Sequence, residues 1–181
     1  QAASLTATVR RTNEACDWLS TKAWDTQVFR QFALHKLVYY DARGAFPDLS
    51  SQMVVRCTAK VADAYKLDKK SLRTFRPLGS IAYDARLLSW KGDTANLWTL
   101  SGRQVVPFVC GEHQRELLAC ERGESDLVLR GGRFYLFVTV DVPEDPTLDD
   151  ARDAVDVFTD LLSDFAFSTP ADFSSWLAGL L

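Results

Sequence analysis

The chain has 181 residues and a net charge of −3, and 47% of its residues are apolar. This length fits one ordinary domain, or one domain with an insertion, and the apolar content is sufficient for a core. No apolar run reaches the length of a membrane span, and residues 1–10 lack the apolar stretch of a secretory signal. We therefore expect a soluble, cytoplasmic protein without a membrane partner.

The cysteines and histidines argue against a metal site. The cysteines show no paired short spacing, and only His35 and His113 could join them at a metal ion. We expect free, buried thiols in a reducing compartment, with no metal and no cofactor. The cysteines are Cys16, Cys57, Cys110 and Cys120.

Charge is distributed unevenly along the chain. Residues 147–181 contain seven acids and one base, whereas residues 1–146 contain 20 bases and 17 acids. The earlier part therefore suits a polyanionic partner better than the later part does.

Apolar residues at helical spacing predict three helices in the first part of the chain. The first helix opens the chain, and its predicted buried stripe is Leu5, Val9, Thr12, Cys16 and Leu19. The second covers residues 29–43 before Gly44, and its predicted buried stripe is Phe29, Ala33, Leu37 and Tyr40. The third is capped by Ser50 or Ser51, continues to about Lys66, and has the predicted buried stripe Val54, Cys57, Val61 and Ala64.

A basic connection follows the third helix. Between residues 66 and 76, one acid, Asp68, stands against five bases, which are Lys66, Lys69, Lys70, Arg73 and Arg76. Two interpretations are open: a solvated, charged linker, or a surface that meets phosphate groups.

The next part of the chain is rich in short strands. Apolar runs punctuated by glycines predict strands at 81–83, 87–90, 97–100 and 105–109, followed by a short helix at 113–120. A hairpin then joins residues 126–130 to 133–142 through Gly131-Gly132, a pair that suits a turn with positive φ. The predicted buried face of its second strand is Phe134, Leu136, Val138, Val140 and Val142. The predicted fold class is α+β, with about three helices followed by strands that form a small antiparallel β-barrel or sandwich.

The last part of the chain changes character again. Thr147 with Asp150 predicts the start of an amphipathic helix with acids on one face, and Pro170 predicts the start of a second helix. The apolar stripe of the first of these helices is Leu148, Ala151, Val155, Phe158, Leu162 and Phe165. We expect three parts: a helical part at 1–74, a β-barrel part at 75–145 and an acidic helical tail at 146–181.

Several segments are similar to the N-terminal half of TnpB proteins, which are transposon-encoded RNA-guided endonucleases related to type V CRISPR effectors. The similar segments keep the family's order over roughly residues 8–145, and the tail from about residue 147 is not matched. They are FALHKLVYY at 32–40, QMVVRCTAKVADAYK at 52–66, Phe75-Arg76-Pro77 with Gly79, Tyr83-Asp84, VPFVCG at 106–111 and residues 133–143.

The resemblance implies a helical recognition insert carried on a β-barrel wedge domain, which together grip a guide RNA and an RNA and DNA heteroduplex. The chain departs from the family in two places: it opens with a helix rather than a strand, and it lacks the family's catalytic Asp-Leu-Gly strand. We therefore expect a non-catalytic module that binds guide-type RNA, DNA or both.

Basic residues and exposed aromatic rings are the side chains that would contact a nucleic acid, through phosphates and stacked bases. The predicted contact residues are Arg56, Lys60, Lys66, Lys69, Lys70, Arg73, Phe75, Arg76, Tyr83, Arg86 and Lys91. Trp90 is a further candidate for stacking, and Arg103 is a further candidate base on the strands. An aromatic residue in a strand more often belongs to the core, so the core is the alternative place for these rings.

The alternative function is a protein interaction or oligomerisation module that uses the amphipathic helices of 147–181. An enzyme is disfavoured, because the sequence has neither a Gly-rich phosphate loop nor a nucleophile elbow. The acids Asp149, Asp153 and Asp156 lie along one helical stripe, which does not suit the converging carboxylates of a two-metal nuclease.

Overall fold

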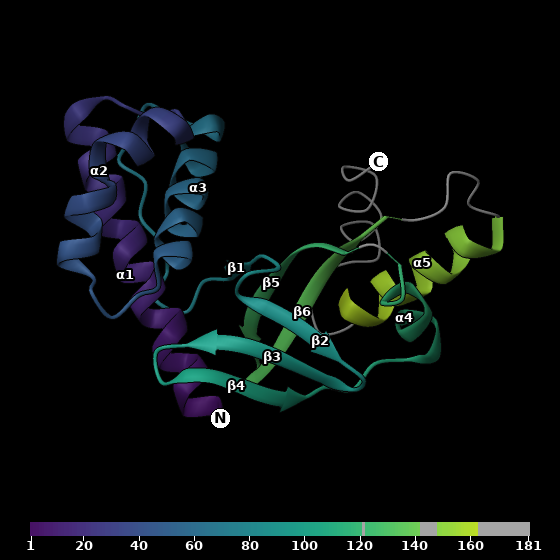
Figure 1. The fold of residues 1–181 in the computed structure, drawn as a ribbon. Helices are drawn as coiled ribbons and strands as arrows, with labels where there is room; N and C mark the ends of the chain where they lie inside the picture. Colours follow the sequence, from purple (N-terminus) through teal and green to yellow (C-terminus); the bar gives the residue numbers. More distant parts are fainter. Residues whose placement is uncertain (121, 142–147, 163–181) are drawn as a thin grey trace. The chain divides into compact units, whose positions relative to one another are not determined.

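A computed structural model of the chain describes residues 1–120, 122–141 and 148–162 (Figure 1). The chain divides into two compact units, Gln1–Asp141 and Val142–Leu181. The first unit contains three long helices and two β-sheets, so the predicted α+β class is confirmed. Residues 1–74 and 75–141 lie together in this first unit.

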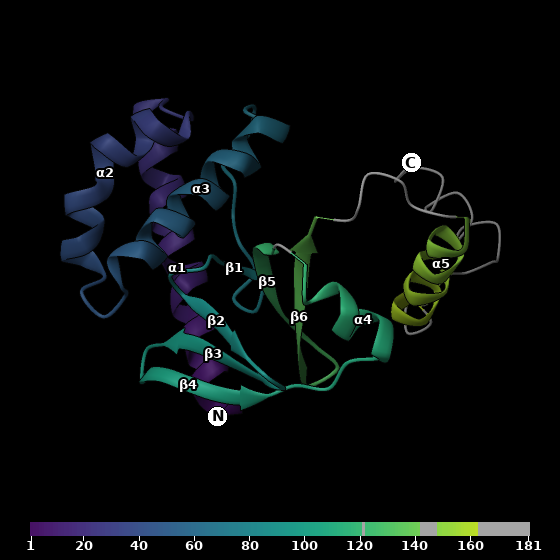
Figure 2. The same ribbon diagram turned by 45° about the vertical axis from the view of Figure 1, so that its right-hand side comes forward.

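Three helices form the N-terminal part of the first unit: α1 (Ala2–Thr26), α2 (Gln31–Ala45) and α3 (Ser51–Leu67). The five residues predicted for the buried stripe of α1 are all buried. Ser50 is the N-cap of α3, and its Oγ accepts a hydrogen bond from the Met53 amide at 3.1 Å. In both views α1 and α3 lie between α2 and the strands (Figures 1 and 2).

The predicted buried stripe of α2 is wrong. The helix buries a different stripe, namely Leu34, Val38 and Ala42. Ala33 is exposed, and the side chains of Leu37 and Tyr40 are 49% and 84% exposed. Apolar residues occupy both faces of this helix, so periodicity alone could not choose between them. Packing on α1 and α3 selects the face with the smaller side chains.

Helix α3 buries more of its surface than the sequence predicted. Val54, Cys57 and Val61 are buried as expected, and Ala64 is half-buried. The helix also buries Met53, Thr58, Ala59, Ala62 and Tyr65. The wider buried face follows from its position, because α3 contacts α1, α2 and the first strand.

The strands form two separate three-stranded antiparallel sheets. One sheet has the order β1 (Ile81–Tyr83), β5 (Arg122–Arg130), β6 (Arg133–Val140), and the other β2 (Leu88–Lys91), β3 (Thr94–Thr99), β4 (Gly102–Pro107). A short helix, α4 (Glu112–Leu117), lies between β4 and β5 in sequence. Each predicted strand overlaps an observed one, but the strand ladders of the described residues remain two sheets and do not close into a barrel.

The β5–β6 hairpin has the predicted two-residue turn. Gly131 and Gly132 both have positive φ, 53° and 76°, which favours glycine at each position. Leu127 pairs with Leu136, and Leu127 is buried. The described residues of the predicted β6 face, Phe134, Leu136, Val138 and Val140, are only half-buried. Val142 lies outside the described residues.

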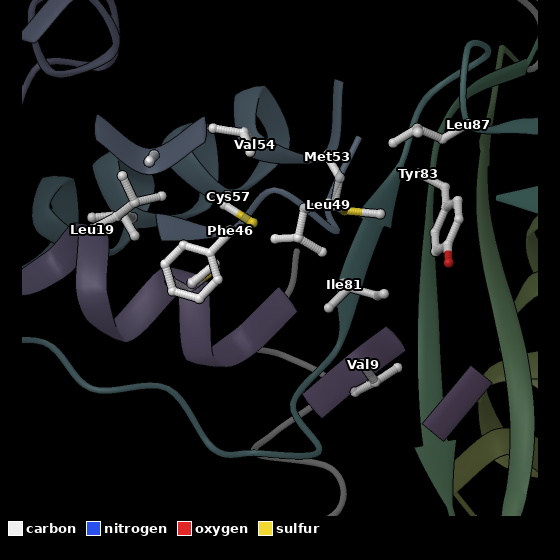
Figure 3. Close-up of a cluster of buried hydrophobic side chains, with 14 of the residues drawn as sticks. Val9, Leu19, Phe46, Leu49, Met53, Val54, Cys57, Ile81, Tyr83 and Leu87 are labelled. Atoms are coloured by element: carbon white, nitrogen blue, oxygen red, sulfur yellow. The ribbon is translucent and has the colours of Figure 1, made fainter. Parts of the chain in front are cut away.

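One hydrophobic core joins the helices to the β1 sheet. Val9 of α1 and Met53 of α3 lie near Ile81 of β1, with Leu49 between the helices and the strand (Figure 3). Tyr83 of β1 and Leu87 extend this cluster toward the strands. The helices and the sheets of the first unit therefore depend on shared packing.

The second unit contains α5 (Leu148–Leu162), which falls on the predicted acidic amphipathic helix. Leu148 at its start is 70% exposed. The predicted cap at Thr147 and the predicted last helix from Pro170 lie outside the described residues. Over the residues that the structure describes, none of the helices is both long enough and apolar enough to cross a membrane.

Candidate nucleic-acid interface

Residues 68–80, which connect α3 to β1, form a strap along α1 and α3. The Ser20 hydroxyl donates to the Arg73 carbonyl at 2.6 Å, and the Arg73 amide donates to the Tyr65 hydroxyl at 3.3 Å. The Phe75 amide donates to Asp17 at 2.7 Å. The strap contains neither helix nor strand, yet side chains of the helices bind several of its backbone groups from Arg73 onward and fix that part of its path.

Asn13 binds the far end of the strap. This residue is fully buried on α1, and its Nδ2 donates to the Gly79 carbonyl at 2.8 Å. Lys60 of α3 donates to Asn13 Oδ1 at 2.7 Å and to the Ser80 carbonyl at 2.6 Å. The Lys60 ammonium also lies 5.1 Å from the centre of the Phe75 ring. Lys60 and Phe75, both predicted contact residues, thus hold the strap in place.

Asp68 organises the start of the strap. Its carboxylate accepts from the Lys70 amide at 2.8 Å, the Ser71 hydroxyl at 3.0 Å and the Arg73 guanidinium at 3.1 Å. These hydrogen bonds, the Lys70 amide first among them, lower the pKa of the Asp68 carboxyl. Arg73 is therefore engaged by its own strap.

Three more of the predicted bases have partners within the protein. Arg56 of α3 forms an ion pair with Glu124 of β5, and Lys66 forms one with Asp63 at 2.7 Å. Arg86 donates to the side chain of Gln52 at 3.1 Å. The Arg86 carbonyl in turn accepts from Arg103 at 2.6 Å. These bases join α3 to the strands or neutralise nearby acids.

Four predicted bases remain available for an external partner. They are Lys69, Lys70, Arg76 and Lys91, and among the described residues their exposed side chains make neither hydrogen bonds nor ion pairs. The first three lie on the strap, and Lys91 ends β2. The strap therefore presents three cations on the surface, two of them beside Asp68 and the third next to the bound backbone at Phe75.

Tyr83, a predicted contact residue, is part of the core, so its ring is not available to stack on a nucleobase. Its side chain is fully buried, because it lies on the same face of β1 as Ile81. The Tyr83 hydroxyl donates to the Trp98 carbonyl at 2.9 Å, and burial raises the pKa of Tyr83. Trp90 is half-buried and packs edge-on against Phe108 with ring centres 5.3 Å apart.

A groove of about 430 Å³ lies where β1, β2 and β5 meet. Trp90, Ser89 and Asp84 line one part of it, and Arg122 and Ser125 line another. Asp84 also accepts from Gln52 at one carboxylate oxygen and from the Arg86 amide at the other, so both oxygens already have a partner. The groove combines the Trp90 ring, the Arg122 guanidinium and the Asp84 carboxylate. In nucleic-acid sites, aromatic rings stack on nucleobases, arginines bind phosphates and nucleobase edges, and carboxylates accept from cytosine.

The cysteines are all free thiols, two of them buried and two half-buried. Cys57 donates to the Thr12 carbonyl at 3.6 Å, and its hydrogen bond with Cys16, together with burial, raises the pKa of the Cys57 thiol. Within residues 1–120, 122–141 and 148–162, no three His, Cys, Asp or Glu side chains are grouped so that they could share a metal ion.

Comparison of the chain with models of known protein families and with curated proteins found no match. The resemblance to TnpB proteins therefore stays a prediction from the sequence segments named above.

Proposed function

We propose that this chain is a non-catalytic nucleic-acid-binding module that holds a guide-type RNA, DNA or a heteroduplex of the two against the strap. The observation that carries the proposal is the strap with three exposed cations, Lys69, Lys70 and Arg76, whose side chains form no hydrogen bond or ion pair with any described residue. Each cation that meets a phosphate releases counterions from the nucleic acid, which favours binding. The resemblance to the binding half of TnpB proteins supports the same class of partner, and this module acts in the cytoplasm.

The proposal extends to the two sheets. We propose that the two sheets are the two halves of a wedge-like barrel and that the helices of residues 1–74 are the recognition part that packs on it. The groove between β1, β2 and β5 then lies at the seam of the barrel and offers Trp90 and Arg122 to the nucleic acid.

The test compares two variants with equal charge changes. Lys69→Gln with Lys70→Gln removes two cations of the strap, and Arg10→Gln with Arg133→Gln removes two exposed cations elsewhere. Binding of a fluorescent 20-nucleotide RNA is measured by anisotropy over a range of salt concentrations. The slope of log affinity against log salt is negative, and each lost phosphate contact makes it less steep by about 0.7 for a single strand or about 0.9 for a duplex.

The strap variant should lose affinity and salt dependence while the control variant keeps both. Adding Arg76→Gln should reduce the slope further. Equal slopes in all variants, with measurable binding, would move the interface to Arg86, Lys91 and Arg103 on the strands. An absence of RNA and DNA binding by the unaltered chain would refute the proposal.

The alternative function is a protein partner or self-association through residues 147–181. The exposed Leu148 on α5 favours it, because a large apolar side chain at the start of an amphipathic helix suits burial in an interface. Apolar association weakens little with salt, so sedimentation at low and high salt distinguishes it from binding to phosphates.

A further inference from the structure

The outer face of α2 carries two large aromatic side chains in water. Phe32 is 83% exposed and Tyr40 is 84% exposed. The opposite face of the helix, with Leu34, Val38 and Ala42, packs into the core. The two exposed rings are therefore not needed for the fold of the first unit.

A lysine lies between the two rings. Phe32, Lys36 and Tyr40 follow one another at four-residue spacing, so they lie on one side of the helix, and Lys36 is exposed. With a rise of 1.5 Å per residue, the two aromatic residues are about 12 Å apart along the axis. This separation is several times the roughly 3.4 Å between neighbouring bases of a duplex strand, so the rings suit bases that are unstacked from each other.

The ring of Tyr40 is supported by its neighbours. Tyr39 packs against it edge-on at 5.4 Å and 75°, and His35 lies 4.8 Å from the Tyr39 ring. A ring that is already oriented loses less side-chain freedom when it binds a ligand. The exposed Tyr40 ring is thus already oriented for stacking on a planar group.

From these contacts we infer that Phe32, Lys36 and Tyr40 form a stacking platform for a single-stranded nucleic acid. Each ring stacks on one unpaired base, and the Lys36 ammonium binds the phosphate between them. A protein partner fits this face less well, because it would bury the ammonium at the centre of the interface, where charged residues are depleted. The inference depends on the proposed nucleic-acid-binding function and adds a second, aromatic contact region to the strap.

The test uses the full chain with two probes, a fluorescent 15-nucleotide oligothymidylate and a blunt 15-base-pair duplex. Phe32→Ala with Tyr40→Ala should weaken binding of the single strand about tenfold or more and leave binding of the duplex within about twofold, since stacking contributes roughly 5-fold to 150-fold per base. Tyr40→Phe should bind like the unaltered chain, because it keeps the ring. Leu37→Ala, on the same exposed face, should also bind like the unaltered chain. Circular dichroism and thermal unfolding confirm that each variant is folded.

The possible results separate the platform from the strap. If the ring variant keeps full single-strand affinity while Lys69→Gln with Lys70→Gln loses it, the platform is refuted and the proposed function stands. If the ring variant and Leu37→Ala both abolish self-association in sedimentation without any change in oligonucleotide binding, the face is a protein interface and the platform is refuted. If the unaltered chain binds neither probe, both proposals fail.

Discussion

The strap and the β5–β6 hairpin differ in how their order is maintained. The hairpin has the most regular pattern in the sequence, yet the described residues of the predicted β6 face are only half-buried and Phe137 is exposed. The strap has no regular pattern, yet buried or half-buried side chains of α1 and α3 bind its backbone at Arg73, Phe75 and Gly79. Backbone hydrogen bonds within the ladder maintain the hairpin, whereas buried polar side chains maintain the strap. We expect the two regions to respond differently to substitution.

The largest effect is expected at Tyr65, which joins the strap to the core. The ring is fully buried, with its centre 4.5 Å from that of Phe29, and the hydroxyl binds Ser20 and the Arg73 amide. Tyr65→Ala should lower the free energy of unfolding by about 3–5 kcal/mol, because it leaves a large cavity. Tyr65→Phe keeps the ring and should cost about 1 kcal/mol. Urea unfolding checks both values, and similar losses in the two variants would show that packing of the ring is unimportant.

The hairpin should tolerate change on β6 but not on β5. Leu127 is buried in the core and pairs with Ile81, whereas Phe137 is exposed. Leu127→Ala should cost about 2–5 kcal/mol, while Phe137→Ala should cost less than about 1 kcal/mol. Thermal and urea unfolding of both variants provide the measurement. A large loss from Phe137→Ala would mean that the exposed face of β6 is covered in solution.

Substitution of Asn13 should lower the free energy of unfolding by a smaller amount and should loosen only the strap. Asn13→Ala removes the donor to the Gly79 carbonyl and an acceptor of Lys60, and should cost about 1–3 kcal/mol. In this variant the rate of amide hydrogen exchange should rise in residues 73–80 and remain unchanged in the β5–β6 hairpin. Thr21→Ala, at an exposed position of α1, is the control and should accelerate exchange in neither region. Equal acceleration in strap and hairpin would contradict separate stabilisation of the two regions.

The smallest effect is expected from protonation of Asp68. Its folded-state pKa is below the ordinary value of 3.8, so its contribution to the strap is present above about pH 4 and is lost as pH falls through the folded pKa. The amide signal of Lys70 in NMR spectra should shift with this titration, because that amide donates to the carboxylate. Asp68→Asn should remove the titration. A Lys70 amide that titrates at pH 4 or above in the unaltered chain would contradict the lowered pKa.

Much of the secondary structure was predictable from local pattern. The stripe of α1, the Ser50 cap of α3, the Gly131-Gly132 turn and the positions of the strands each depend on neighbouring residues. The stripe of α2 was not predictable, because both of its faces are apolar. Tyr83 was named as a candidate for stacking although an aromatic residue in a strand more often belongs to the core, and the structure places it in the core.

For the basic residues of the candidate interface, too, the local sequence could predict only part of what the structure shows. The sequence by itself identified a cluster of bases between residues 56 and 91, because charge is a property of the residue. Only the tertiary structure decided which basic side chains have partners, since Arg56 forms an ion pair with Glu124 and Lys60 donates a hydrogen bond to Asn13, both across tens of residues. It also decided that the strap is held between residues 73 and 80, because the backbone partners there lie on α1 and α3. Local pattern determines which element forms, whereas the partner of a side chain depends on contacts that no short stretch of sequence contains.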